Sequence, residues 1–184
     1  MRSTLRSTAS AAALLVMLTT PGAAQSDKFA ADLVKSIGEL EEKVTALAKA
    51  MPEAAFAWRP MAGTRSSSEV FRHIAADNYF LPVLVGVSAP DATGIKSEYK
   101  TVQAYETRKA SRDEIMAELA RSFAHLKQAL QQTTPAQLTE TATFFGQTNT
   151  RQQVWIMTTT HLHEHLGQLI AYARSNNIKP PCSN

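Results

Sequence analysis

The chain has 184 residues, of which 44% are hydrophobic and 19% are charged, with a formal net charge of +3. This balance is typical of one folded domain and excludes a disordered or collagen-like chain. The single Cys excludes an internal disulfide framework and any CxxC zinc or redox motif.

The N-terminus has the order of a secretory signal. Arg2 and Arg6 precede an apolar stretch over 11–18, and small residues follow over 21–24. We predict cleavage after Ala24, with cleavage after the next residue as the alternative. An uncleaved membrane anchor is a second alternative, but the apolar stretch is far shorter than the ~20 residues that span a bilayer.

The mature domain is therefore expected to comprise residues 25–184 and to be exported, either periplasmic or secreted. Cleavage removes two arginines and no acid, so the net charge falls from +3 to +1. This charge gives no reason to expect nucleic-acid binding, and we expect no stable membrane insertion after cleavage. In an oxidising compartment Cys182 would have no internal partner.

Helical periodicity dominates the mature chain. From Leu33 to Met51 the apolar residues are spaced 4, 3, 4, 3 and 4 residues apart, which predicts a bundle helix that ends before Pro52. Ser66 and Glu69 have capping-box spacing, so a second helix should begin near residue 67. Pro82, near its far end, should kink or end that helix.

Two further helices follow in the second half of the chain. Ser111 and Glu114 form another capping box before a third helix, and a fourth is predicted from about Thr150 to Arg174. The connections over 88–106 and 133–149 are long, and the first has room for a short helical turn. No segment shows sustained strand alternation. The predicted fold is an all-α four-helix bundle.

The histidines carry the chemical information. Three of the five crowd into the fourth helix, where His161 and His165 share one face and His163 points away. The shared face is the predicted inward stripe, so two imidazoles can reach one ion. His73 lies on the inward face of the second helix and is the natural third ligand. His163 and His125 are expected to face solvent or a groove.

Three imidazoles suit Zn, Ni, Fe, Co or Cu, and three protein ligands leave positions open for water or substrate. We therefore expect a divalent transition metal, with Zn, Ni and Fe as the leading candidates. A hydrogen-bonded core cluster and a set of surface histidines are the alternatives. An HExxH site is excluded because Gly167 stands where its second His belongs.

Two polar residues flank the three histidines. Asp77 follows His73 by one helical turn and is expected to orient a ligand imidazole or to act as a general base, unless it is a structural carboxylate. Gln168 follows His165 by three residues and is expected to hydrogen-bond a water at the metal, unless it serves helix packing.

The chain resembles the DinB-like superfamily, also called YfiT-like metal-dependent proteins. The resemblance covers nearly the whole mature chain and rests on four segments. They are Trp58-Arg59-Pro60, Ser66 to Ile74, Phe144-Phe145-Gly146 followed by His161 to Leu169, and the tail Tyr172 to Pro181.

The resemblance implies an up-down-down-up bundle and a divalent metal held by His73, His161 and His165. Some members are transferases or isomerases that use a low-molecular-weight thiol, and homodimers are frequent. The export signal sets this chain apart from the better-known members, because cytosolic thiols need not be present where an exported protein works.

Two functions follow from these observations. The first is a metal-dependent enzyme, of hydrolase or thiol-dependent transferase type, in which the ion acts as a Lewis acid. The second is a non-catalytic module in which the metal is structural or the bundle binds a small ligand or partner.

Overall fold

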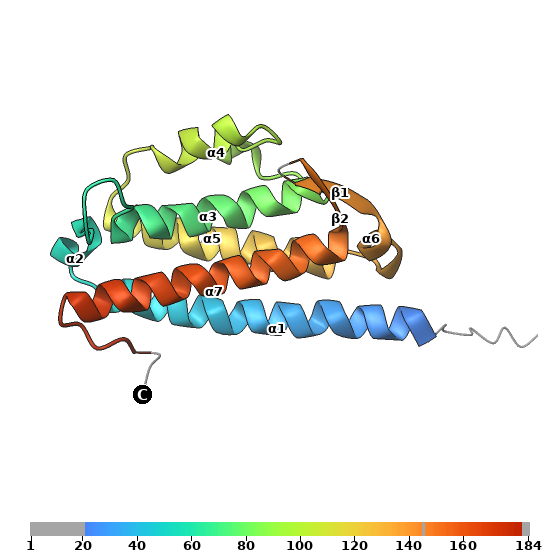
Figure 1. The fold of residues 1–184 in the computed structure, drawn as a ribbon, viewed down its shortest axis with the longest axis horizontal. Coiled ribbons are helices and arrows are strands. Elements are labelled where there is room, and N and C mark those ends of the chain that lie inside the picture. Colours follow the sequence, from blue (N-terminus) through green and yellow to red (C-terminus); the bar gives the residue numbers. More distant parts are fainter. Residues whose placement is uncertain (1–20, 145, 182–184) are drawn as a thin grey trace, which may run out of the picture.

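The computed structural model describes residues 21–144 and 146–181, with side chains described from residue 28 onward. Most of the predicted signal and Cys182 lie outside the described residues. Four long helices dominate the described part (Figure 1): α1 (Pro21–Ala50), α3 (Ser67–Leu84), α5 (Arg112–Gln131) and α7 (Arg151–Ser175).

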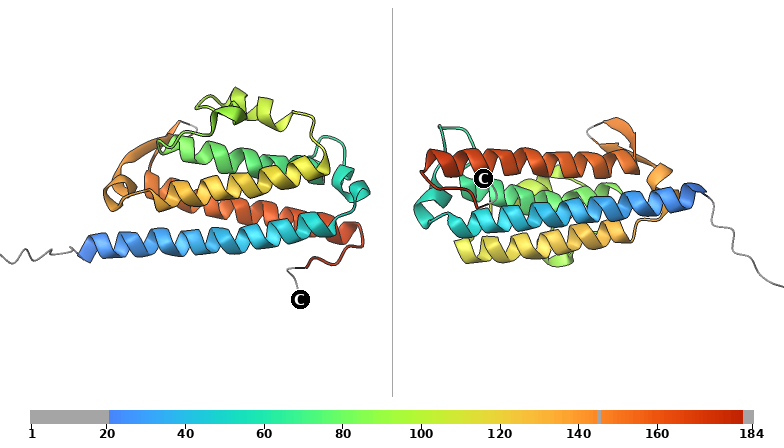
Figure 2. Two further views of the ribbon diagram at one scale, coloured as in Figure 1. Left: turned by 180° about the vertical axis from the view of Figure 1, so that it is seen from behind. Right: turned by 90° about the horizontal axis from the view of Figure 1, so that it is seen from below.

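The four long helices form one bundle with the predicted up-down-down-up direction. α1 and α7 run one way, while α3 and α5 run the other way (Figure 2). α1 packs between α5 and α7, and α3 packs between the same two helices on the far side. Because α3 and α5 are parallel, their connection must travel back along the bundle. It does so as a crossover that carries the 3₁₀ turn η1 (Asp91–Thr93) and α4 (Tyr99–Glu106), which lies over α3 (Figure 1).

Both predicted capping boxes are present. The Ser66 hydroxyl accepts from the backbone N–H of Glu69, whose carboxylate accepts from the Ser66 N–H at 2.7 Å. Ser111 and Glu114 make the same pair of contacts at the start of α5. These contacts satisfy backbone donors that the first helical turn leaves unpaired. Pro82 lies in the last turn of α3, which ends two residues later.

The expectation of no strand was wrong. The connection before α7 holds α6 (Pro135–Thr139) and a hairpin of β1 (Thr141–Phe144) and β2 (Gln147–Thr150). The strands pair antiparallel from Thr141↔Thr150 to Phe144↔Gln147. Gly146 has φ 75°, a conformation that favours Gly and permits the tight turn. A further short helix, α2 (Glu53–Ala57), lies in the earlier connection. The hairpin is small, and the fold remains all-α.

Within residues 28–144 and 146–181 no helix is both long and apolar enough to cross a membrane.

The core runs along the bundle axis and is apolar. The largest fully buried side chains come from all four long helices: Ile37, Leu40, Leu47, Phe71, Ile74, Leu119, Phe123, Leu126, Leu130, Trp155 and Leu162, with Met51 directly after α1.

Candidate metal centre

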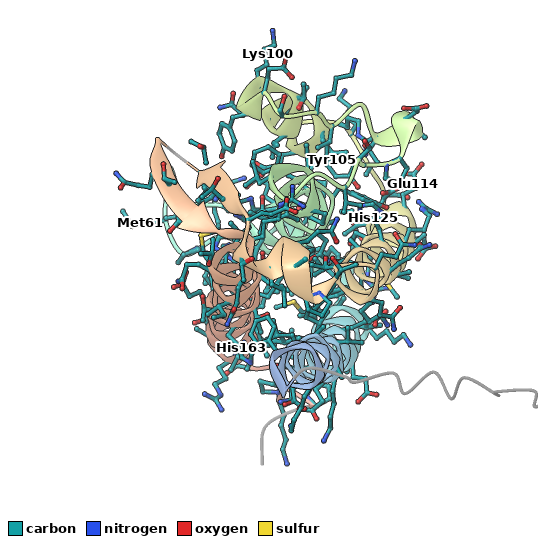
Figure 3. All side chains as sticks on the ribbon, turned by 90° about the vertical axis from the view of Figure 1, so that its right-hand side faces the viewer. Met61, Lys100, Tyr105, Glu114, His125 and His163 are labelled. Atoms are coloured by element: carbon teal, nitrogen blue, oxygen red, sulfur yellow. The ribbon has the colours of Figure 1, made fainter. Side chains whose placement is uncertain are left out.

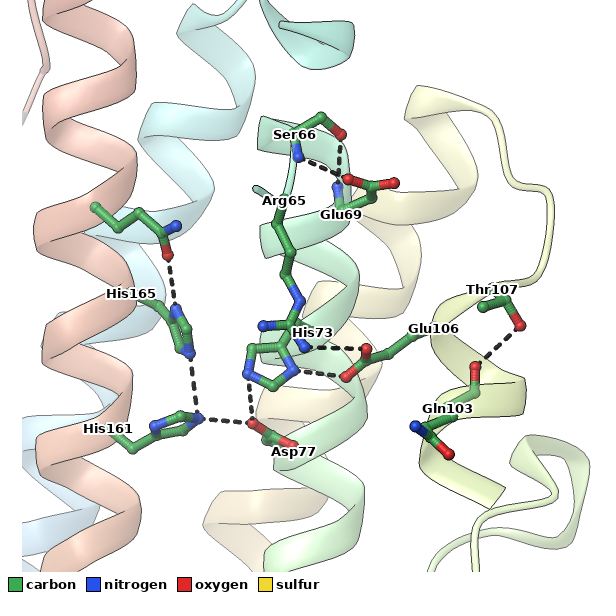
Figure 4. A network of polar contacts seen from close by, with 11 residues as sticks. Arg65, Ser66, Glu69, His73, Asp77, Gln103, Glu106, Thr107, His161 and His165 are labelled. Carbon is green, nitrogen blue, oxygen red and sulfur yellow. Dashed lines mark hydrogen bonds and ion pairs between the residues drawn. The ribbon is translucent and has the colours of Figure 1, made fainter. Parts of the chain in front are cut away.

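Four polar side chains converge between α3 and α7, at mid-height of the bundle (Figure 4). They are His73 and Asp77 from α3, and His161 and His165 from α7. One ligand atom of each lies within 4.8 Å of the corresponding atoms of the other three. His161 Nε2 is 2.7 Å from Asp77 Oδ2 and 3.2 Å from His165 Nε2. His73 Nε2 is 3.2 Å from the same Asp77 oxygen.

The helix geometry explains this convergence. Each pair is spaced by four residues, so each shares one helix face. α3 and α7 are antiparallel neighbours, and this places His73 beside His165 and Asp77 beside His161 (Figure 4). The structure thus brings together all three histidines that the sequence proposed as ligands.

The sequence placed the two α7 histidines in the centre of the buried stripe, and this detail was wrong. The stripe is formed instead by Leu162, Leu166 and Leu169. His161 and His165 lie on its flank toward α3 and are half-buried, with 32% of the His161 side chain exposed. The flank position keeps the imidazoles beside the core and within reach of a ligand from outside.

In two of the imidazoles, the outer ring nitrogen, Nδ1, points away from the centre of the cluster and is held by a hydrogen bond. His73 Nδ1 donates to Glu106 Oε1 at 2.5 Å, and His165 Nδ1 donates to Gln168 Oε1 at 3.0 Å. The Gln168 amide donates in turn to the Tyr172 hydroxyl at 2.9 Å. A carboxylate and an amide oxygen only accept, so both Nδ1 atoms must carry the proton. In its neutral form, each of these two imidazoles therefore presents the Nε2 lone pair to the centre of the cluster.

Protonation at the centre is uneven. The Asp77 carboxylate accepts a hydrogen bond from His161, and this raises the pKa of that imidazole. Burial lowers the pKa of His165 to about 4, because it disfavours the charged ring. Of these two imidazoles, His161 therefore holds a second proton more readily, and His165 offers its lone pair more readily.

This donor set fits a divalent transition ion. Metal–nitrogen distances of about 2.0–2.1 Å place neighbouring ligand atoms about 2.8–3.4 Å apart in tetrahedral or octahedral sites. The 3.2 Å between Nε2 of His161 and Nε2 of His165 lies in that range, and a ring nitrogen of His73 lies within 4.8 Å of both. Metal-ligating histidines usually donate their other ring N–H to a protein acceptor, as His73 and His165 do here.

Sequence reasoning missed Glu106 and Arg65. Glu106 is the last residue of α4, and its second oxygen is 3.3 Å from Arg65 Nη2. Burial opposes the charge on Glu106, but the hydrogen bond from His73 and the nearby guanidinium outweigh it and lower its pKa. The contact joins residues 33 positions apart across the crossover, and no local spacing predicts it. The expected helical turn in that connection was the sole signal.

The remaining candidates lie elsewhere or act differently. His163 is exposed on α7 and His125 is half-buried on α5 (Figure 3), outside the convergent group. Glu164 is exposed, and its carboxylate is 3.8 Å from the outer nitrogen of His161. Gln168 was expected at a water on the metal, but its oxygen accepts from the outer nitrogen of His165.

A cavity of about 340 Å³ opens beside the cluster. His73, Asp77 and His161 form its polar wall. Arg65 stands at one side, and the rest of the lining is apolar or aromatic and comes from four elements: Phe80 and Leu81 of α3, Tyr99 of α4, Phe144 of β1 and Met157 of α7. A small molecule in this cavity would touch the convergent atoms.

Comparison with known proteins agrees with this architecture. The family model of the DinB superfamily matches residues 37–169. The chain belongs to the DinB superfamily. The match includes α3, α4, α5 and most of α7, and so covers every residue of the cluster.

Solved structures share the DinB fold. The DinB-like protein YjoA from Bacillus subtilis has a TM-score of 0.61 at 15% identity, covering 79% of this chain and 92% of its own. A DinB-like protein from Bacillus cereus ATCC 10987 has a TM-score of 0.63 at 20% identity, covering 83% of this chain and 95% of its own. No curated protein matches the chain.

Proposed function

We propose that this DinB-superfamily protein binds a divalent transition metal, Zn, Ni or Fe, through the Nε2 atoms of His73, His161 and His165. The observation that carries the proposal is the convergence of lone pairs whose outer nitrogens are already fixed by Glu106 and Gln168. A divalent cation would accept these lone pairs and offset the charge of the Asp77 carboxylate in a half-buried site.

We further propose that the centre is catalytic, of hydrolase or thiol-dependent transferase type. The adjoining cavity supports this, because a substrate within it reaches the same atoms. A bound ion would supply Lewis acidity. Asp77 lies on the cavity wall and can accept a proton from an entering nucleophile, either water or a thiol.

The alternative is a structural metal. A structural ion has a closed set of protein ligands, whereas a catalytic ion keeps an open position. The cavity beside His73 and His161, and the partial exposure of His161, favour the catalytic role. Activity is tested on a panel of ester, amide and electrophilic substrates, each with and without added thiol. Turnover in the loaded protein and not in the metal-free protein is the expected result.

Metal binding is tested by elemental analysis of the purified protein. Wild-type protein should hold one ion per chain, and the triple replacement of His73, His161 and His165 by Ala should hold none. The matched control replaces His125 and His163, which lie outside the cluster, and should keep the ion. Unchanged metal content in the triple variant would show that the assigned site is wrong.

A further inference from the structure

Arg65 occupies a distinctive place in the candidate site. It is the one Arg or Lys that lines the cavity within the described residues, and most of the other lining residues are apolar or aromatic. It lies just before α3, and its guanidinium reaches past His73 to Glu106 (Figure 4). A cation at the edge of an apolar cavity is a means of orienting a ligand by charge.

The Arg65 guanidinium makes few contacts within the protein. Among the described residues its one polar contact is from Nη2 to Glu106 Oε2, at 3.3 Å. The side chain is 40% exposed. A guanidinium has five N–H donors in a planar fork that matches a carboxylate. One long contact leaves most of that fork available to a ligand.

The charge of the site supports an anion only when the metal is present. Arg65, Asp77 and Glu106 carry a formal sum of −1, with the imidazoles neutral as metal ligation requires. A divalent ion changes that sum to +1. That positive sum would favour an anionic ligand, whose apolar part would lie against Phe80, Leu81 and Met157.

We propose that the cavity takes a small molecule with an apolar or aromatic body and one carboxylate, and that Arg65 binds this carboxylate. The inference rests on the proposed metal site, since the loaded centre supplies the positive balance. Arg65 is here a binding residue and not a metal ligand, so its loss should change ligand affinity without changing metal content.

The test uses matched pairs of probes that differ only in charge: benzoate and benzamide, 3-phenylpropionate and 3-phenylpropionamide, hexanoate and hexanamide. Affinities are measured by calorimetry on metal-loaded protein, and metal content is measured on the same samples. We expect at least one carboxylate to bind ~10-fold or more tightly than its amide, as a charge-assisted hydrogen bond would give. Arg65→Gln should remove this preference and keep the metal.

Arg59→Gln is the matched control. Arg59 precedes α3 in the same segment, is 43% exposed and also pairs with a glutamate, but does not line this cavity. It should keep the preference. Arg65→Lys retains the positive charge and should keep most of the preference for the carboxylate probe. If Arg65→Gln lowers metal content, Arg65→Lys serves as the metal-retaining comparison, and it must then bind the carboxylate less tightly than wild type.

The outcomes separate the two proposals. Wild-type protein that holds no metal contradicts the proposed function. Metal-loaded protein that shows no carboxylate preference in any pair overturns the inference alone. A preference that survives in metal-loaded Arg65→Gln also overturns it, because the carboxylate would then be bound by the ion.

Discussion

The α3–α7 and α1–α5 interfaces lie on opposite sides of one bundle and follow the same helical periodicity, yet they are built differently. From residue 28 onward, the buried side chains of α1 are all hydrophobic, and α5 adds only Ser122 to an apolar set. Charged contacts lie at the margins, as in the 2.5 Å pair of Lys127 with Glu41.

Across the bundle, the α3–α7 interface carries His73, Asp77, His161 and His165 at positions that the same periodicity could give to apolar residues. A buried polar group is costly unless it has partners. Here the outer atoms have protein partners, and the inner atoms have one another. The contrast teaches that one interface serves stability, whereas the other tolerates a cost to stability and carries a group of side chains that could hold a metal ion.

The largest expected effect lies on the apolar side. Phe123 is fully buried on α5, and Phe123→Ala should lower the free energy of unfolding by about 3–5 kcal/mol through lost burial and a cavity. His161→Ala, at a half-buried position, should lower that of the metal-free protein by about 1 kcal/mol or less. Denaturant unfolding of both variants checks this. Equal losses would remove the distinction between the two interfaces.

Metal removal should act on the polar interface alone. At a free metal concentration of ~100 times Kd, binding stabilises the folded state by about 2.7 kcal/mol. A chelator should therefore lower the melting temperature of wild-type protein. It should have no effect on the variant in which His73, His161 and His165 are replaced by Ala. A chelator effect of equal size in that variant would place the ion elsewhere.

The crossover should contribute to metal affinity through Glu106. Glu106→Gln keeps the size of the side chain but weakens the hold on His73 Nδ1, so metal affinity should fall ~10–100-fold. Glu98→Gln is the matched control, since Glu98 precedes the same short helix and makes no capping contact. Competition with a chromogenic chelator measures both. Equal affinities in the two variants would show that Glu106 does not support the site.

A smaller effect is expected at the helix starts, where α3 and α5 are alike. Ser66→Ala and Ser111→Ala should each cost about 1 kcal/mol. The Ser66 backbone N–H, by donating to Glu69, lowers the pKa of that carboxyl below its ordinary 4.5. This stabilisation is present above pH 4.5 and is lost as the pH falls through the lowered pKa. The difference in stability between wild type and Glu69→Gln, which removes the titrating carboxyl, should shrink accordingly. A pH-independent difference would contradict the assignment.

Much of the bundle could be predicted because its signals are local. The 4–3 spacing before Pro52 and the two capping boxes each act within a few residues, and they gave the helices and their starts. The hairpin could not be predicted, because its strands are four residues long and its alternation is weak. The antiparallel pairing of those strands depends on a Gly turn.

The site divides in the same way. The i, i+4 spacing selected His161 and His165, and the inward face of the second helix selected His73 and Asp77. Glu106 and Arg65 could not be selected, because the crossover brings them to the site only after the bundle has formed. Single-sequence periodicity describes one helix at a time, whereas the partners of the outer nitrogens depend on how helices pack.

An anomalous difference map from crystals of metal-loaded protein would show directly whether the three Nε2 atoms hold one ion. We expect one strong peak between α3 and α7, about 2.0–2.1 Å from Nε2 of His73, His161 and His165. A map of fully loaded protein with no peak there, or with its peak at His163 or His125, would contradict this expectation.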